Sequence, residues 1–465
     1  RIVKGKALII VVAKKVKQEK LITLNLNQVP TVTKNYDAII IGAGIIGAAI
    51  GYELSKKGLH TLNVEMLPAA GYGSTSNSCA IIRLYYSTLD GSAMAYDGYY
   101  YWREWADYLE APKEEQLAKF HECGTLVMKT KLNDGLRKQL VFMDALNICY
   151  EHRSNAQILE NYPFYDLSSF APAKTLDDPN FGEPTGGQID GAIFFPNGGY
   201  ISDPQFATRN IQLAAERAGA TFLFNSRVKE IPTKNGSVEG VLLSDGTRIN
   251  APVVINVAGP HSSQINAMVG ADADMKISTR ALRQEVAHVP VPKGTDYSAV
   301  ACVTSDSDAA VYTRPEVGNN ILIGSEDPPC DSHIFVDPDN YDLNFSNQWT
   351  VQAQRLGLRF PDLGIPGKLK GCVDLYDVTE DWMPIYDSSY IEGYFMACGT
   401  SGNQFKNAPV VGKVMAELIE YCESGNDHDG EPMGYQLENI DHEISLATFS
   451  RLREINQNST FSVLG

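Results

Sequence analysis

The stretch Tyr36 to Glu65, YDAIIIGAGIIGAAIGYELSKKGLHTLNVE, decides the fold because it describes a complete strand, helix and strand unit. Ala38 to Ile41 is a short apolar run, typical of a buried parallel strand, and a glycine triplet follows it directly. Gly42 permits a tight turn, Gly44 lets the backbone approach a pyrophosphate, and Gly47 lets the helix pack close to the strand. Because the helix would point its N–H groups and positive dipole end at the phosphates, the spacing predicts dinucleotide binding.

The second half of the unit indicates which dinucleotide fits. A helical pattern continues to Lys56 and Lys57 and stops at Gly58, where cations and a glycine suit a helix end. A second strand from His60 to Val64 ends at Glu65, whose carboxylate would bind the ribose hydroxyls. That carboxylate favours NAD or FAD over NADP. A glycine triplet alone can mark a structural turn, but the full register favours the cofactor.

Composition excludes several classes of protein. The 465 residues, 44% hydrophobic and 20% charged, are typical of a globular chain with two domains. A formal net charge of −17 argues against a nucleic-acid partner. The eight cysteines form no CxxC pair and no Cys/His cluster at zinc spacing, so we expect no metal site. Scattered cysteines favour a reducing compartment, which predicts a cytoplasmic protein.

Residues 1–35 form a lysine-rich N-terminal extension. The apolar run Ala7 to Ala13 has about the length of a signal-peptide core, but no small-residue cleavage site clearly follows it. The segment is either an extension packed as a stray strand or a targeting remnant, and the latter would make the protein organellar. No run reaches the 18 or so apolar residues that span a bilayer.

Patterns along the rest of the chain predict a mixed α/β fold, with a Rossmann-like domain of the glutathione-reductase type and an interleaved antiparallel-sheet domain. Gln284 to Val289, Ala309 to Thr313 and Asn320 to Gly324 are strand-like segments between Pro and Gly turns. The predicted division places the dinucleotide domain at 36–95, 190–275 and 372–425 and the substrate domain at 96–189 and 276–371. Residues 426–465 are then a C-terminal tail.

Several motifs in order along the chain resemble one family. They are the unit at 36–65, STSNSCAIIR from Ser74, NGGYISDP from Asn197, NVAGP from Asn256, RPEVGNNILIG from Arg314, TEDWMPI from Thr379 and GTSGNQFKNAPVVG from Gly399. Together they resemble the D-amino-acid-oxidase-like superfamily of FAD amine oxidoreductases. The nearest branch holds sarcosine oxidases, the sarcosine oxidase β subunit and dimethylglycine dehydrogenase.

The resemblance implies FAD as cofactor and assigns residues to it. The glycine triplet would hold the pyrophosphate, Glu65 the adenosine ribose, and the loop at 74–76 would face the phosphates and ribityl chain. A segment at 399–406 would lie beside the flavin pyrimidine edge. The implied cofactor residues are Gly42, Gly44, Gly47, Glu65, Ser74, Thr75, Ser76, Val228, Ala258, Gly259, Gly399, Ser401, Gly402, Asn403, Gln404, Phe405 and Lys406.

The resemblance also implies a substrate site. By itself Arg83 would be expected on the surface, but the AIIR and GxxFK-like motifs imply that Arg83 and Lys406 clamp an amino-acid carboxylate. On an ungapped reading, Arg280 corresponds to a basic residue that lies over the flavin and promotes reaction with oxygen. Tyr85, Tyr86 and Tyr312 are candidates to enclose the substrate, and core packing explains them equally well.

Departures from the family pattern concern the flavin linkage. Asn77 stands in the region of the His that attaches FAD covalently in some members, and Asp374 stands at the position of the attaching Cys. Cys372 lies two residues before that position. We therefore expect noncovalent FAD.

The implied activity is oxidation of the C–N bond of a small amino or N-methylamino acid, by hydride transfer to flavin N5 and imine hydrolysis. Sarcosine and dimethylglycine are candidate substrates. The alternatives are an L-proline dehydrogenase of the same fold, an FAD-dependent 2-hydroxy-acid dehydrogenase, and a noncatalytic flavin-binding subunit of a larger complex. The electron acceptor would be oxygen, a quinone or an electron-transfer protein, and the chain could form homo- or hetero-oligomers.

Overall fold

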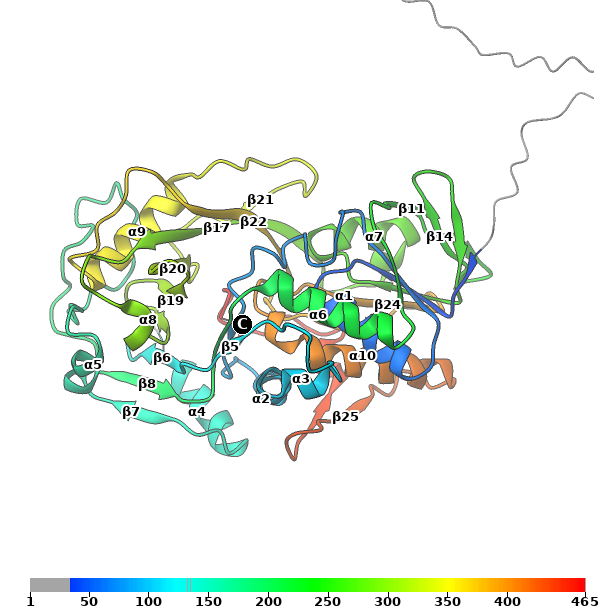
Figure 1. Ribbon diagram of the computed structural model, residues 1–465, viewed down its shortest axis with the longest axis horizontal. Coiled ribbons are helices and arrows are strands. Elements are labelled where there is room, and N and C mark those ends of the chain that lie inside the picture. The colour runs from blue at the N-terminus through cyan, green and yellow to red at the C-terminus, as the bar shows by residue number, and fades with distance from the viewer. Residues whose placement is uncertain (1–33, 132, 134, 465) are drawn as a thin grey trace, which may run out of the picture.

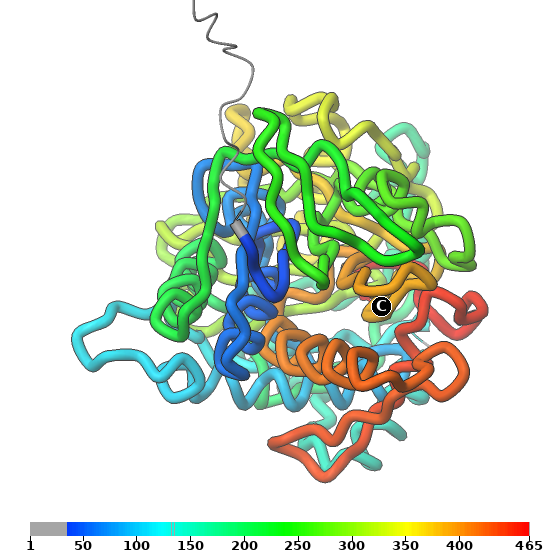
Figure 2. Tube along the Cα trace, turned by 90° about the vertical axis from the view of Figure 1, so that its right-hand side faces the viewer, coloured from blue at the N-terminus to red at the C-terminus, as the bar shows by residue number. Residues whose placement is uncertain are grey.

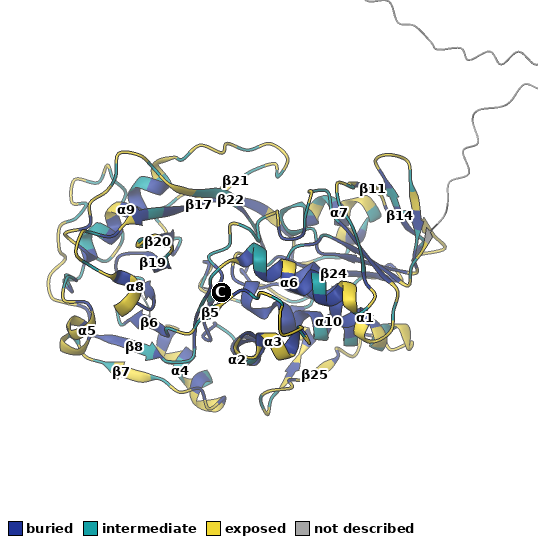
Figure 3. Cartoon of the chain, in the orientation of Figure 1, coloured by how far each residue is buried: buried dark blue, intermediate teal, exposed yellow. Residues whose placement is uncertain are grey.

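The computed structural model describes residues 34–131, 133 and 135–464, so the predicted features of residues 1–33, including the run Ala7 to Ala13, lie outside the described residues. Figure 1 shows two halves side by side, one built around β24 and the helices α1, α6 and α10, the other around β17, β19 and β20. The central strands of each half are mostly buried, while strands at the edges, such as β7 (Glu151–Arg153), and many surface loops are exposed (Figure 3).

The quoted stretch folds as β2 (Ala38–Ile41), α1 (Ile45–Lys56) and β3 (Thr61–Val64), and β2 pairs with β3 in parallel. This unit forms the centre of the first sheet, which is parallel except for β23 at its edge. In spatial order, that sheet consists of β10 (Thr221–Leu223), β3, β2, β16 (Val253–Asn256), β24 (Tyr394–Cys398) and β23 (Ile385–Ser388).

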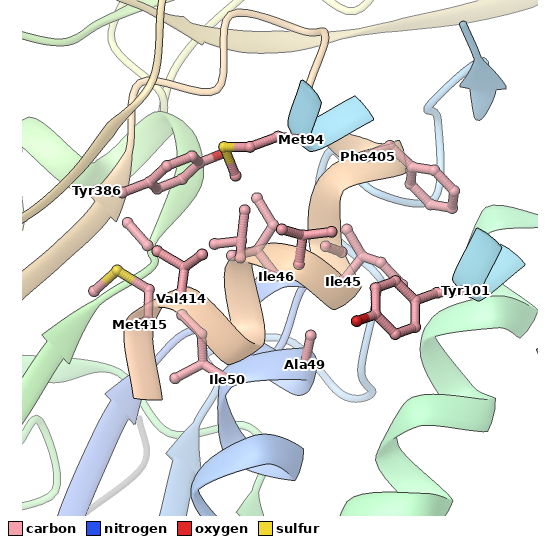
Figure 4. Packing of buried hydrophobic residues seen from close by; sticks show 14 of the residues in the cluster. Ile45, Ile46, Ala49, Ile50, Met94, Tyr101, Tyr386, Phe405, Val414 and Met415 are labelled. Atoms are coloured by element: carbon pink, nitrogen blue, oxygen red, sulfur yellow. The ribbon is translucent and has the colours of Figure 1, made fainter. Parts of the chain in front are cut away.

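Alternation along β2 divides the core between the two faces of this sheet. Ile40 belongs to the core on the helical face of the sheet. On that face α1 packs against α6 (Pro204–Arg217) and α10 (Ala408–Glu423), as Figure 2 shows, and Figure 4 shows Ile46 and Ile50 of α1 beside Val414 and Met415 of α10. Ile39 packs on the opposite face, against a small sheet and α7 (Ser262–Val269). Each fully buried isoleucine stabilises the fold by roughly 1.5–3 kcal/mol, which fixes the register of β2. The small sheet consists of β1 (Lys34–Asn35), β15 (Arg248–Asn250), β14 (Gly240–Leu243) and β11 (Val228–Glu230).

The second half is built on a larger, mostly antiparallel sheet covered by α9 (Asn347–Arg359), whose Trp349 and Leu356 pack on it. β18 and β6 are a parallel pair within it. In spatial order, its strands are β21 (Ile334–Phe335), β17 (Arg280–Pro290), β20 (Asn320–Ser325), β19 (Val311–Glu316), β18 (Val303–Asp306), β6 (Thr125–Met128), β8 (Ala192–Phe195) and β7 (Glu151–Arg153), with β22 (Gly371–Val378) also paired to β17.

The chain crosses between the halves at places that differ from the predicted division. β8 belongs to the larger sheet, although residues from 190 were assigned to the dinucleotide domain. β22 pairs with β17 from Gly371 to Val378, beyond the predicted boundary at 372. Conversely, α2 (Leu89–Arg103) packs on α10 in the first half. Pairing partners far along the chain determine these memberships, which local patterns do not specify.

The remaining elements are short connections. They are β4 (Ile81–Ile82), β9 (Gly199–Ile201) and β5 (Phe120–His121) in one small sheet, the pairs β12 (Thr233–Lys234) with β13 (Ser237–Val238) and β25 (Gly434–Gln436) with β26 (Glu443–Ser445), the helices α3 (Trp105–Tyr108), α4 (Gly135–Ala145), α5 (Asn155–Asn161) and α8 (Tyr297–Val300), and the 3-10 turns η1 (Gly259–His261), η2 (Ala271–Ala273), η3 (Phe405–Asn407) and η4 (Leu446–Phe449). Within the described residues, no helix combines the length and apolar character that crossing a membrane demands.

Candidate functional site

A cavity of about 600 Å3 lies where the two halves meet. It starts at the carboxyl ends of β2 and β3, the edge at which open α/β sheets bind ligands, and reaches Arg83 and Tyr85. The larger sheet contributes Gln284 and Val286 of β17 and the residues 303–305 of β18. A long ligand could therefore place one end on the first sheet and the other against the second.

The glycine turn forms the first end of this cavity. Gly42 has a φ of +121°, and a Cβ there would lie 2.4 Å from the Val257 carbonyl oxygen. A Cβ on Gly47 would lie 2.5 Å from the Gly42 oxygen, so both positions need glycine. Gly44 caps α1 without a side-chain hydrogen bond and lines the cavity. This turn and the first N–H groups of α1 fit a pyrophosphate.

Glu65 stands beside the turn at the end of β3. Its carboxylate accepts hydrogen bonds from the Ala43 and Leu67 amides, each at 2.9 Å. The side chain lines the cavity and is held in place by the backbone on both sides, in the position expected for a ribose partner.

The loop after β3 closes over the turn. The Thr75 hydroxyl accepts a hydrogen bond from the Ile45 amide at 3.3 Å, and Ser74 donates one to Asp374 at 3.2 Å. Both residues line the cavity, whereas Ser76 bonds to the Gly73 carbonyl and is outside the lining. Three further predicted cofactor residues line the cavity: Val228, Ala258 and Gly259.

In the loop between β24 and α10, some of the predicted cofactor residues line the cavity and others do not. The predicted residues Gly402, Asn403, Gln404, Phe405 and Lys406 line the cavity. Gly399 and Ser401 lie behind this lining. The Gly399 amide donates to the Asp377 side chain at 2.7 Å, and the Ser401 amide donates to the Asp377 carbonyl oxygen at 2.9 Å. Burial raises the pKa of Asp377, and this carboxyl group, which the sequence reasoning missed, shapes the loop from β22.

Arg83 and Lys406 converge at the far end of the cavity. Both are buried, and they approach the same Tyr86 ring, with Arg83 Cζ 4.2 Å and Lys406 Nζ 5.2 Å from its centroid. Lys406 donates to the Tyr86 hydroxyl at 2.8 Å and to the Asn403 carbonyl at 2.7 Å. Burial, followed by the charge of Arg83, lowers the pKa of Lys406 well below its ordinary value.

The bonds of Arg83 correct the expectation of a surface arginine. Its guanidinium donates to the carbonyl oxygens of Tyr85 and, at 3.0 Å, of Val463. Among the described residues, no carboxylate forms an ion pair with Arg83 or Lys406. The cavity thus ends in two buried cationic side chains that a ligand anion could neutralise.

Arg280 is not part of this arrangement. It begins β17, is exposed, and stacks over the Phe335 ring at 4.0 Å, outside the cavity lining. The ungapped reading placed this residue over the cofactor, but Gln284 and Val286 are the residues of β17 that line the cavity. Of the candidate tyrosines, Tyr85 and Tyr312 line it as well.

The positions relevant to covalent attachment also face the cavity. Asn77 donates to Asp374 at 2.6 Å, and neither carries a thiol or an imidazole. Cys372 lines the same wall, and burial raises its pKa to about 12, which disfavours the nucleophilic thiolate. Within the described residues, no group of three or more His, Cys, Asp or Glu side chains could hold a metal ion.

Sequence reasoning missed several residues of the cavity wall. Val373, Leu375 and Tyr376 of β22 line the cavity together with Asp374, and this run of consecutive residues has no alternation that a sequence pattern could reveal. Val463 and Leu464 come from the C-terminal tail, for which no function was expected, and no local signal identifies them.

Comparison with known proteins identifies the family to which the chain belongs. The family described as DAO, FAD dependent oxidoreductase, matches residues 37–418. A glycerol 3-phosphate dehydrogenase of Caloramator mitchellensis is 27% identical over 83% of this chain and 74% of its own length. A glycine oxidase of Geobacillus kaustophilus is 23% identical over 85% and 96%, and the sarcosine oxidase subunit beta of Rhodobacter capsulatus is 24% identical over 84% and 86%.

Solved structures show the same fold. An L-proline dehydrogenase from P. horikoshii matches with a TM-score of 0.68 and 20% identity, over 83% of this chain and 94% of that one. The Geobacillus kaustophilus glycine oxidase matches with a TM-score of 0.67 and 20% identity, over 86% and 98%. The glycine turn, the fixed Glu65 and the long cavity fit the dinucleotide that the family uses. The chain therefore belongs to the DAO family of FAD-dependent oxidoreductases.

Proposed function

We propose that the protein oxidises the C–N bond of a small amino acid or N-methylamino acid, such as sarcosine or dimethylglycine, at the far end of the cavity. The observation that carries the proposal is the convergence of Arg83 and Lys406, both buried, on Tyr86. Two cationic groups brought together away from water are costly unless an anion joins them, and a carboxylate matches the guanidinium fork.

The residues of this chain act by binding and orientation. Arg83 and Lys406 hold the substrate carboxylate, while Tyr85, Tyr312 and Val286 supply walls that keep water out. FAD, when bound, supplies the acceptor for the hydride that leaves the carbon next to nitrogen. Since the amine lone pair drives that departure, a substrate bound as the neutral amine needs no general base, and water hydrolyses the imine product.

The flavin is held without a covalent bond in this proposal. Asn77 and Asp374, at the two positions where relatives could attach flavin, are joined by a hydrogen bond, and burial keeps the Cys372 thiol protonated. Acid precipitation should therefore release all of the yellow colour into solution, and flavin that stays with the pellet would contradict noncovalent binding.

A second candidate is oxidation of a hydroxyl-bearing anion, which the relative named glycerol 3-phosphate dehydrogenase favours. Arg83 could hold its anionic group, but a hydroxyl must lose its proton. Lys406, with its lowered pKa, could accept that proton in its neutral form and would then not serve as a second cation. L-proline oxidation, suggested by the structural match to a proline dehydrogenase, would use the amine chemistry unchanged.

Anaerobic mixing tests the proposal. The purified holoprotein is mixed with sarcosine, dimethylglycine, L-proline, D-alanine and 2-hydroxyglutarate, and bleaching of the flavin band is followed before air is admitted. We expect one of the amines to bleach the flavin rapidly. Bleaching by the hydroxy acid alone would support the second candidate, and no bleaching at all would support a noncatalytic subunit. Prompt reoxidation by air would identify an oxidase, and slow reoxidation a dehydrogenase that uses a quinone or a protein acceptor.

A further inference from the structure

The C-terminal segment reaches the same end of the cavity as the two cations. Residues 450–459 are tied to the turn after β22, where Arg453 forms an ion pair with Asp381 at 2.8 Å and Ser459 donates to the Asp381 carbonyl at 2.6 Å. From this anchor, residues 460–464 run to the cavity, whose lining includes Val463 and Leu464. Val463 is 7% exposed, packs with Leu282 and Trp382, and lines the cavity.

The main chain of Val463 is held at both ends. Its N–H donates to Asp327 Oδ2 at 3.3 Å, and its carbonyl oxygen accepts from Arg83 Nη2 at 3.0 Å. Asp327 is fixed in turn by Gln284, which donates to its other oxygen at 2.8 Å. The Val463 N–H and C=O groups are separated by one α-carbon, so a carboxylate and a guanidinium face each other across the skeleton of an α-amino acid.

We propose that residues 460–464 form an internal plug whose Val463 occupies the α-amino-acid subsite, with Arg83 as the carboxylate partner and Asp327 as the amine partner of the substrate that displaces it. This inference rests on the proposed function and deepens it, because it restricts the substrate to molecules that carry the amine one carbon from the carboxylate. Asp327 becomes a positioning residue that the family resemblance did not indicate.

The exchange is physically reasonable because the substrate makes stronger versions of both contacts. A carboxylate offers Arg83 a charged, two-pronged partner in place of an amide oxygen, and an amine or ammonium offers Asp327 more than a peptide N–H does. Phe461 of the plug is 41% exposed, and the hydrogen bond of Ser459 to Asp381 lets residues 460–464 move without unfolding the chain before them. Burial raises the pKa of Asp327 to about 6, which leaves the carboxylate ionised at neutral pH.

A plug and a fixed wall predict opposite effects of removing the segment. If the subsite is open in only a fraction of molecules, the apparent Kd of any ligand exceeds the intrinsic value by the inverse of that fraction. Removing residues 460–465 from the holoprotein, with Ser459 kept as the anchor, should then tighten binding. From the charged hydrogen bond to Arg83 alone, we expect the Kd for acetate and for a nonreducing α-amino acid analogue to fall about tenfold or more.

The experiment measures these Kd values from the perturbation of the flavin spectrum. Val463→Gly, which removes the buried isopropyl group, should shift the Kd in the same direction, while Ile455→Gly, at a position that is 40% exposed and outside residues 460–464, should leave it unchanged. Chymotrypsin should cut after Phe461 faster when the ligand is bound. Weaker or unchanged binding in both the truncated protein and Val463→Gly, or protection of Phe461 by the ligand, would show a fixed wall and overturn the plug.

The flavin bleaching assay separates this outcome from failure of the proposed function. If the full chain is reduced by an amine but truncation does not tighten ligand binding, the plug alone is wrong. If no amine reduces either protein while carboxylates still bind more tightly to the truncated one, the plug stands and the chemistry is wrong.

Discussion

Replacing Lys406 by methionine separates the role of this residue in binding from its role in folding. The amine is buried, and its two hydrogen bonds go to the Tyr86 hydroxyl and the Asn403 carbonyl. Methionine leaves neither oxygen without a hydrogen bond, because the Tyr86 hydroxyl itself donates to the Asn403 carbonyl at 2.5 Å. We therefore expect a folded protein that has lost one cation from the end of the cavity.

The magnitude follows from the contact that is lost. A hydrogen bond to a charged group contributes about 1.5–3 kcal/mol, so the affinity for acetate should fall by a factor of about 10 to 150. Stability should rise in the same variant. Burial, followed by the charge of Arg83, lowers the pKa of Lys406, so folding at neutral pH either strips its proton or buries its charge.

The pH dependence gives a second signature. An anion beside Lys406 favours its protonated form, so wild-type affinity is greatest at low pH and falls as the pH rises through the lowered pKa of Lys406. Lys406→Met should show weak affinity without this pH dependence. The assay is a spectral titration with acetate between pH 6 and 10, together with urea unfolding. Lys413→Met, at a lysine paired with Glu438 at 3.0 Å outside the cavity, is the matched control. Unchanged acetate affinity, or a preserved pH profile, would refute the reasoning.

Three further predictions concern the glycine turn, a buried acid and a loop over the cavity. Gly42→Ala should lower the free energy of unfolding by at least about 2 kcal/mol, because Gly42 has a φ of +121° and a Cβ there would clash with the Val257 carbonyl. Gly44→Ala should fold but lose flavin. Thermal melts test the first expectation, and flavin absorbance tests the second. Glu326 accepts a hydrogen bond from Ser305, and burial raises its pKa from 4.5 to about 7. The free energy of unfolding therefore falls by about 3 kcal/mol as the pH rises from about 4.5 to 7, and Glu326→Gln should resist urea better than the wild type at pH 8.5 but not at pH 5. Arg227 lines the cavity and forms an exposed ion pair with Asp339, in the segment between β21 and α9 whose Tyr341 also lines the cavity. Because an exposed ion pair contributes little, Arg227→Ala should speed FAD release by no more than about fivefold, measured by flavin fluorescence.

The glycine turn and the unit around it could be predicted from sequence because their requirements are local. A φ of +121° and close approach of backbone atoms permit only glycine at Gly42, and alternation along β2 specifies both faces of a buried strand. The cavity accordingly contains most of the predicted residues, including Gly44, Glu65 and Lys406.

The rest depends on contacts between distant parts of the chain. Arg83 meets the carbonyl of Val463, 380 residues away, and no pattern in the tail indicates that contact. Arg280 was placed by an ungapped reading, whereas the pairing of β17 with β22 determines which of its residues face the cavity. Asp377 acts through the backbone of the loop after β24, a role that has no signature in sequence.

The central claim is that buried Arg83 and Lys406 make a carboxylate the handle of an amine substrate. The most direct measurement compares the rate of anaerobic flavin reduction by sarcosine with that by dimethylamine, which offers the same N-methyl group without a carboxylate. We predict that sarcosine is faster in kcat/KM by at least about a hundredfold, from two charged contacts, and that Arg83→Ala removes most of this preference. Equal rates for the two amines, or a preference that survives Arg83→Ala, would contradict the account.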